Sequence, residues 1–305
     1  MYSTFSGLRN KIFGQNNKTY KNRFNNTNYE DIKIENNVNN LTNKIVKKCN
    51  NVLVKREQDC QCFDKNNYPS KKYNSCINRN NNKNCKTYNK CKRIFSGLMS
   101  GSEPEYDPEN WANPLIEGSH NCYAYMLDDK MPHLKNKCLT ICKNKGYNNY
   151  QCKSNKQKVN NCSNLKPQPG NYALKYGNLD KKERVYKCPN MIKKVLRDNY
   201  DKKTQKSVVI PVKFDSKCPK NYYKGALVVH KGRTYHFYRQ DKNVRYSHKQ
   251  GTLRVENIDA SKKPIYAPHL SNMDFSRGRK NGIKYDDFCS YFCIPRNFHK
   301  KTHAT

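Results

Sequence analysis

One cysteine and two histidines in the later part of the chain have types and predicted positions that suit thiol chemistry. Cys122 lies near the start of a segment, residues 121–128, that begins like a helix, with Ser119 or Asn121 as its N-cap. Free backbone N–H groups at a helix N-terminus stabilise a thiolate, so we expect the pKa of the Cys122 thiol to be depressed. The sequence therefore predicts Cys122 as a nucleophile, with its own backbone N–H helping to hold an oxyanion.

His236 lies in a predicted strand, residues 234–240 (TYHFYRQ), and is the candidate general base for that nucleophile. Because side chains alternate along a strand, His236 shares a face with Tyr238. His248 lies on the next predicted strand, where a polar group can fix the imidazole tautomer of His236 and aim its ring. The order of a cysteine, a strand histidine and a polar residue on the neighbouring strand is chemically coherent.

The elements that must position these residues are two helices and a set of antiparallel strands. Turn residues Lys231-Gly232-Arg233 separate two apolar, alternating runs and predict a β-hairpin. The predicted helices cover residues 121–128 and 188–199, and the predicted strands cover 208–212, 225–230, 234–240, 244–248 and 288–295. Helices followed by an antiparallel meander indicate an α+β fold.

Four runs of sequence carry a resemblance to known proteins. They are SHNCYAYMLDD (119–129), KPQPGNYA (166–173), CPKNYYKGALVV (218–229) and YHFYRQDKNVRYSHKQG (235–251). They resemble a group of poorly characterised bacterial and giant-virus proteins with an NCYAYAL-type helix and a YHFYRQ…WSHKPG hairpin. That pattern is similar to the NlpC-type branch of the papain-like cysteine peptidase superfamily, over roughly residues 105–295.

The resemblance implies a papain-like core, in which a cysteine-bearing helix packs on a small antiparallel sheet. It implies Cys122 as nucleophile, His236 as base and His248 as orienting residue, with peptide or amide bonds as the substrate class. This chain has Met126, Tyr246 and Gln250 where the pattern has alanine, tryptophan and proline, and none of the three touches the proposed chemistry.

Composition divides the chain into regions. Residues 1–95 form a basic arm rich in Asn, Lys and Cys, with short helical segments, and we expect this arm to be weakly ordered or stapled by disulfides. A Gly-, Ser- and Pro-containing linker follows at 96–108. The papain-like domain is predicted at 109–297 with a Cys-rich insertion at 129–165, and a basic tail follows at 298–305.

The chain has 15 cysteines, an odd number, so at least one thiol stays unpaired if the others form intramolecular bridges. Disulfides acquired outside the reducing cytosol are the preferred interpretation, and irregular zinc binding is the alternative. No paired CxxC knuckles occur, so we predict no metal site, and the dyad chemistry requires no cofactor. Cys289 and Cys293, four apart, would share a strand face and are interpreted as cystine partners.

The charge balance, 60 Lys+Arg against 24 Asp+Glu, gives a formal charge of +36. A field of that size favours polyanions, so the basic arm is expected to bind DNA or an acidic protein surface. The alternative is that the charge results from compositional drift, because the codons of an AT-rich genome encode many Lys and Asn residues. The sequence contains no stretch of about 20 apolar residues, so it predicts no membrane-spanning helix. The N-terminal residues MYSTFSGLRNKIFG lack the apolar core of a secretory signal.

These observations predict a candidate thiol hydrolase, a peptidase or amidase. The Asn- and Lys-rich composition looks like that of giant DNA viruses, which suggests a virion component assembled in the host cytoplasm beside other virion proteins. The first rival is a catalytically inactive, disulfide-linked structural virion protein. The second rival is a nucleic-acid-binding module driven by the arm.

Overall fold

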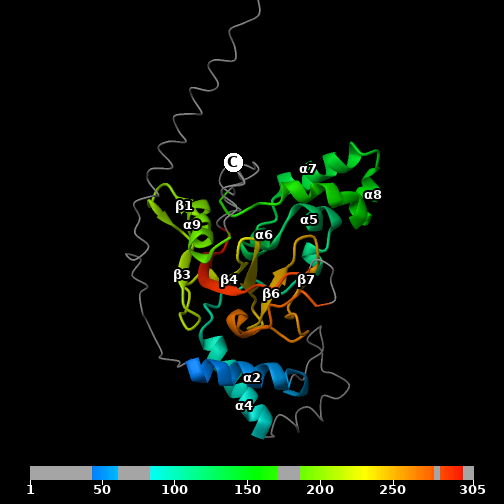
Figure 1. The fold of residues 1–305 in the computed structure, drawn as a ribbon. Coiled ribbons are helices and arrows are strands. Elements are labelled where there is room, and N and C mark those ends of the chain that lie inside the picture. Colours follow the sequence, from blue (N-terminus) through cyan, green and yellow to red (C-terminus); the bar gives the residue numbers. More distant parts are fainter. Residues whose placement is uncertain (1–42, 61–82, 171–185, 278–281, 298–305) are drawn as a thin grey trace, which may run out of the picture. The chain divides into compact units, whose positions relative to one another are not determined.

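The computed structural model describes residues 43–60, 83–170, 186–277 and 282–297. All of them belong to one compact unit, residues 38–305. Helices and strands are mixed along the described chain, so the α+β class predicted from the sequence is confirmed (Figure 1). Among the described residues no helix is long and apolar enough to cross a bilayer.

A six-stranded antiparallel sheet forms the centre, in the order β3-β8-β4-β5-β6-β7. Its strands are β3 (Ile210–Val212), β4 (Tyr222–His230), β5 (Thr234–Gln240), β6 (Tyr246–Lys249), β7 (Val255–Glu256) and β8 (Asp287–Pro295). Strands β4 to β6 follow the predicted meander, and β7 is a short strand that the sequence did not predict. The last strand departs from it, because β8 inserts between β3 and β4. A separate two-stranded hairpin pairs β1 (Tyr200–Asp201) with β2 (Lys206–Ser207).

The β4–β5 hairpin forms where the turn residues predicted it, with Gly232 at a positive φ of 71° in the turn. Strand β4 is buried along most of its length, because both faces of the sheet are covered. At Gly225 a side chain would have no room. A Cβ there would lie 2.5 Å from Ile294 Cδ1 and 2.7 Å from Met126 Cγ. The glycine thus allows the cysteine-bearing helix to approach β4 closely.

Helices cover one face of the sheet. They include α5 (Pro114–Ser119), α6 (Cys122–Met126) and α9 (Cys188–Asp198), and they bury one continuous apolar cluster with Phe237 and Leu227 of the hairpin. Helix α9 has Pro189 in its first turn and buries Met191, Ile192 and Val195, as its 3.6-residue periodicity predicts. The opposite face packs against the loops between β7 and β8, through residues such as Ile265 and Tyr285.

The predicted insertion is a small helical module. It contains α7 (Pro132–Lys143), α8 (Asn149–Ser154) and η3 (Lys156–Leu165). Two disulfides, Cys138–Cys162 and Cys142–Cys152, join these short elements. Such short helices gain little stability from their own hydrogen bonds, so cross-links and packing on α5 hold them in place.

The described part of the predicted arm is a stapled pair of helices, α2 (Asn43–Cys60) and α4 (Lys83–Gly97). Disulfides Cys49–Cys91 and Cys60–Cys85 join them, as the disulfide-stapled alternative expects for these residues. Helix α2 also contacts the main domain, because Glu57 pairs with Arg245 and accepts a 2.6 Å hydrogen bond from Tyr266. The prediction that the arm binds DNA or an acidic protein surface stays a prediction.

Twelve of the 13 cysteines among the described residues lie in six disulfides, which confirms the preference for cystines over zinc at those positions. The prediction that Cys289 and Cys293 are partners of each other is wrong. Cys289 bonds to Cys188 on α9, and Cys293 bonds to Cys218. The physical reason is distance, because two residues four apart on one strand lie about 13 Å apart, whereas a disulfide requires Cα atoms about 5.5 Å apart.

Candidate functional site

Cys122 lies at the first position of α6, in the place that the sequence predicts. Of the two N-cap candidates, Asn121 is the cap, since its side chain accepts from the N–H groups of Tyr123 and Ala124 at 3.1 and 3.2 Å. The Asn121 amide also donates to Pro167 O at 2.6 Å, which fixes the turn before the cysteine. Within the described part of the chain Cys122 is the free cysteine, and it is buried.

The open edge of β5 allows the Cys122 sulfur to contact the backbone of the hairpin. Strand β6 pairs with β5 only at residues 238–240, so no strand of the described segments lies beside the first half of β5 on that side. There the Phe237 backbone hydrogen-bonds to the Cys122 sulfur and, with the N–H groups at the start of α6, favours the thiolate. The sulfur therefore lies next to the backbone of the residue that follows His236.

Two histidines form a directed chain of hydrogen bonds that ends at His236, on the cavity that Cys122 also lines. His248 Nε2 lies 3.0 Å from Ile258 O, and a carbonyl can only accept, so Nε2 of His248 carries the proton. Neutral His248 then has its lone pair on Nδ1, which lies 2.9 Å from His236 Nε2. His236 must therefore donate from Nε2, and its own lone pair is on Nδ1. A general base needs the free lone pair on the nitrogen not used for orientation, and this arrangement provides it.

Aromatic rings hold the His236 imidazole in one orientation. Tyr285 stacks on it with ring centroids 5.3 Å apart at 20°, and Tyr238 meets it edge-on at 5.1 Å and 84°. His248 crosses it at 89° with centroids 5.0 Å apart. Tyr238 lies on the His236 face of the sheet, as the period of two predicts. The ring thus cannot turn over without breaking its packing and its hydrogen bond to His248.

A cavity of about 450 Å³ opens at this point, and both Cys122 and His236 line it. Its walls also include Tyr235, Tyr285, Lys166 and the loop around Gly251. His248 is buried behind His236. The structure therefore brings together the three residues singled out from the sequence, with two of them on one cavity and the third bonded to the base. Their catalytic roles stay a prediction.

The electrostatics of the pair differ from the expectation. Burial raises the pKa of the Cys122 thiol to about 12, even though nearby backbone N–H groups and Lys249 lower it in part. The predicted depression is wrong, because α6 has only five residues and water is largely excluded. Burial, followed by the nearby His248, lowers the pKa of His236 well below its usual value. The resting pair is a neutral thiol and a neutral imidazole.

Lys249 is a site residue that the sequence reasoning missed. It is buried, and its ammonium donates to three carbonyls: Glu117 O at 3.2 Å, His120 O at 2.9 Å and Gly251 O at 2.6 Å. These bonds tie the turn before Cys122 to the loop on the cavity wall. Its positive charge also favours the Cys122 thiolate, while burial lowers the pKa of Lys249 itself to about 7. The one feature of the sequence that could have pointed to Lys249 is its position directly after His248.

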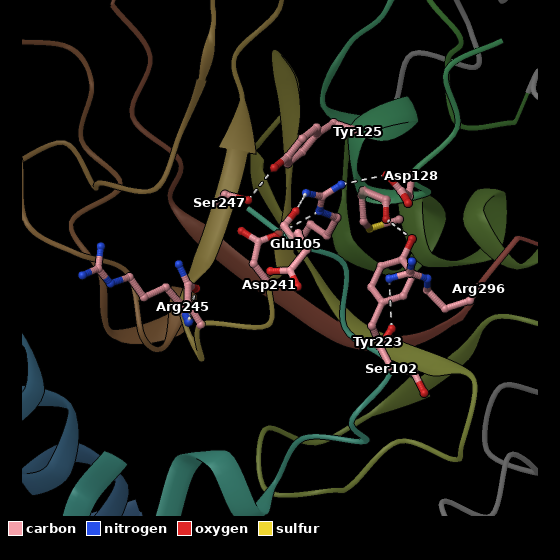
Figure 2. Close-up of polar contacts among 12 residues, drawn as sticks. Ser102, Glu105, Tyr125, Asp128, Tyr223, Asp241, Arg245, Ser247 and Arg296 are labelled. Atoms are coloured by element: carbon pink, nitrogen blue, oxygen red, sulfur yellow. Dashed lines mark hydrogen bonds and ion pairs between the residues drawn. The ribbon is translucent and has the colours of Figure 1, made fainter. Parts of the chain in front are cut away.

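A second buried cation, Arg239, joins the cysteine-bearing helix to the histidine strands. From β5 it donates to Asp241 and to Asp128, both at 2.9 Å, and its guanidinium lies 4.2 Å from the centre of the Tyr125 ring. Tyr125 in turn bonds Ser247 at 2.6 Å, directly before His248 (Figure 2). This network fixes the end of α6 against β5 and β6, so it sets the distance between the helix and the hairpin.

Taken together, the fold and the cavity define a buried cysteine–histidine site on an α+β scaffold cross-linked by disulfides. Over 47 residues the chain is 47% identical to "Insoluble matrix shell protein 1" of Ruditapes philippinarum, which is 15% of this chain and 32% of that protein. The match therefore spans about a third of that protein's length. No family model matches the chain, and no solved structure matches it.

Proposed function

We propose that the chain is a thiol hydrolase on a papain-like core, acting on amide or ester bonds of peptides, isopeptides or proteins. The observation that supports this most is the hydrogen-bond chain from Ile258 O through His248 to His236, ending at the cavity that Cys122 lines. A packed core does not need two buried histidines with fixed tautomers, one of which lines the same cavity as a free thiol. Nucleophilic catalysis by a thiol uses one such histidine as base and a second polar group to orient it.

In the proposed reaction His236 Nδ1 takes the thiol proton while the Cys122 sulfur attacks the substrate carbonyl carbon. The backbone N–H of Cys122 stabilises the developing oxyanion. The His236 imidazolium then gives its proton to the leaving amine or alcohol, the carbon–nitrogen or carbon–oxygen bond breaks, and a thioester remains. Water activated by His236 hydrolyses the thioester and restores the thiol. His248 accepts from His236 Nε2 throughout, so its own proton does not move.

The neutral resting pair fits this order of events. Burial keeps the thiol protonated until a carbonyl is present, so deprotonation and attack occur together as general base catalysis. Lys249, close enough to favour the thiolate, compensates part of the cost of charging the sulfur. An exposed thiolate waiting at rest is not required.

The test is acylation by p-nitrophenyl acetate, with the acetyl group located by peptide mass spectrometry. We expect a burst of nitrophenol and a thioester on Cys122, both lost in Cys122→Ala and strongly reduced in His236→Gln. His230→Gln is the matched control, because His230 ends strand β4, does not line the cavity and pairs with Asp286. Acylation of Cys122 at the rate of a cysteine in a short peptide, unchanged by His236→Gln, would contradict the proposal.

A structural role is the second candidate. Six disulfides cross-link the described residues, as suits a protein matured in an oxidising environment. The 47-residue likeness to a matrix shell protein also favours an extracellular structural role. The virion location has only the resemblance of sequence and composition as support. A folded chain in which Cys122 does not acylate would favour the structural candidate.

A further inference from the structure

Lys166 places a positive charge on the wall of the cavity that contains the thiol. The residue follows η3 and precedes Pro167, whose carbonyl accepts from the Asn121 side chain at 2.6 Å. Because Asn121 directly precedes Cys122, the backbone at Lys166 is tied to the start of α6. The Lys166 side chain lines the cavity together with Cys122 and His236.

This ammonium has no countercharge among the described residues. Lys156, at the other end of η3, pairs with Glu117 at 3.1 Å, whereas Lys166 forms no ion pair with a carboxylate in the part of the chain that the structure describes. None of the described residues that line the cavity is Asp or Glu. Burial lowers the pKa of Lys166, and a negative charge on Cys122 raises it, so an anion in the cavity is what stabilises the ammonium.

We propose that Lys166 is a specificity-determining residue that binds an anionic group, of the carboxylate class, close to the carbonyl that Cys122 attacks. This inference rests on the proposed function and adds the charge of the substrate to it. A partly buried cation without a partner costs desolvation energy, and a carboxylate from the substrate offsets that cost with a charge-assisted hydrogen bond. Neutral or cationic substrates do not offset it.

The alternative is that Lys166 acts only on the thiol and favours its ionised form. Two alkylating reagents separate these roles, because iodoacetate carries a carboxylate and iodoacetamide carries a neutral amide of similar size. Each forms a sulfur–carbon bond at Cys122, releases iodide, and transfers the thiol proton to the buffer. The measured quantity is the ratio of their rate constants at Cys122, from peptide mass spectrometry at pH 8, normalised to the ratio for a cysteine in a short peptide.

We expect Lys166→Met to lower the iodoacetate-to-iodoacetamide ratio about fivefold. That factor corresponds to about 1 kcal/mol, the interaction of two unit charges about 4 Å apart in water. Lys153→Met is the matched control, because it removes one exposed positive charge from α8 of the same module, outside the cavity lining. Its ratio should equal that of the unaltered protein, and a thermal melt of each variant checks the fold.

The inference fails if the ratio is unchanged in Lys166→Met. It also fails if both reagents slow by the same factor, because that result assigns Lys166 to thiol ionisation alone. Failure of the proposed function is separate and shows as ester acylation that does not depend on His236. A charge preference that persists without such acylation would identify an anion-binding cavity in a protein that is not a hydrolase.

Discussion

The hydrogen bond between His248 and His236 gives the sharpest prediction about the site. Replacement of His248 by leucine removes the acceptor 2.9 Å from His236 Nε2 and leaves that N–H buried among aromatic rings. An unsatisfied buried donor costs about 1–3 kcal/mol. His236 can avoid the cost by moving its proton to Nδ1, but this tautomer has a hydrogen where the thiol proton must go. Either way the catalytically competent tautomer loses population.

A change of 1–3 kcal/mol corresponds to a rate change of about 5- to 150-fold, so acylation of Cys122 by p-nitrophenyl acetate should slow by that factor in His248→Leu. His248→Asn should recover much of the loss, because an amide oxygen can occupy the place of Nδ1 and accept from His236. The assay is the burst rate, with a urea titration to compare folding. Equal rates in His248→Leu and the unaltered protein, or equal rates in the leucine and asparagine variants, would refute the tautomer reasoning.

Three further predictions concern the thiol and its supports. Because burial raises the pKa of Cys122 to about 12, the thiol stays protonated below that pH. The rate of its alkylation by iodoacetamide should therefore be lower than that of glutathione at pH 7 and should still rise above pH 9. A rate that reaches a plateau below pH 8 would contradict this. Gly225→Ala should destabilise the protein by about 1–3 kcal/mol through overpacking, seen as a lower melting temperature, whereas Gly97→Ala, where a Cβ meets nothing within 4 Å, serves as the control. Arg239→Met should lower the free energy of unfolding, measured in urea, by about 3–5 kcal/mol, because it leaves Asp241 buried without its cation. The double variant with Asp241→Leu should recover stability. Equal losses in the single and double variants would argue against the ion pair.

Local signals in the sequence were enough to predict the positions of the candidate residues. The alternation of apolar residues around Gly232 defines the hairpin and the face on which His236 lies. Asn121 before an apolar run defines the start of the helix at Cys122. Both signals depend only on neighbouring residues, so they survive folding unchanged, and α9 was predicted for the same reason.

The electrostatic state of the site could not be predicted in the same way. The pKa of Cys122 depends on how much water reaches it, and that depends on packing by β5 and by loops more than 100 residues away in sequence. Lys249 and Arg239 lie in strands where an alternating pattern would allow them to face solvent. Their burial depends on carbonyls and carboxylates brought there by other elements. The pairing of Cys289 with Cys188 likewise joins residues 101 positions apart, which no local pattern can predict.

The arrangement of the cysteines bears on the choice between an enzyme and a structural protein. In the described chain, cystines join the two arm helices to each other and the helices of the insertion to one another, and they join Cys188 of α9 and Cys218 to β8. Among the described cysteines Cys122 alone is reduced, and it lines a cavity. A protein built only for cross-linking gains nothing from a thiol that is kept apart from other cysteines and lines a cavity together with a tautomer-fixed histidine. Burying His236 and His248 also costs desolvation energy that apolar residues would avoid. The disulfide framework therefore accounts for the cross-linking of the fold, and the proposed hydrolase is what would give the reduced thiol a separate role.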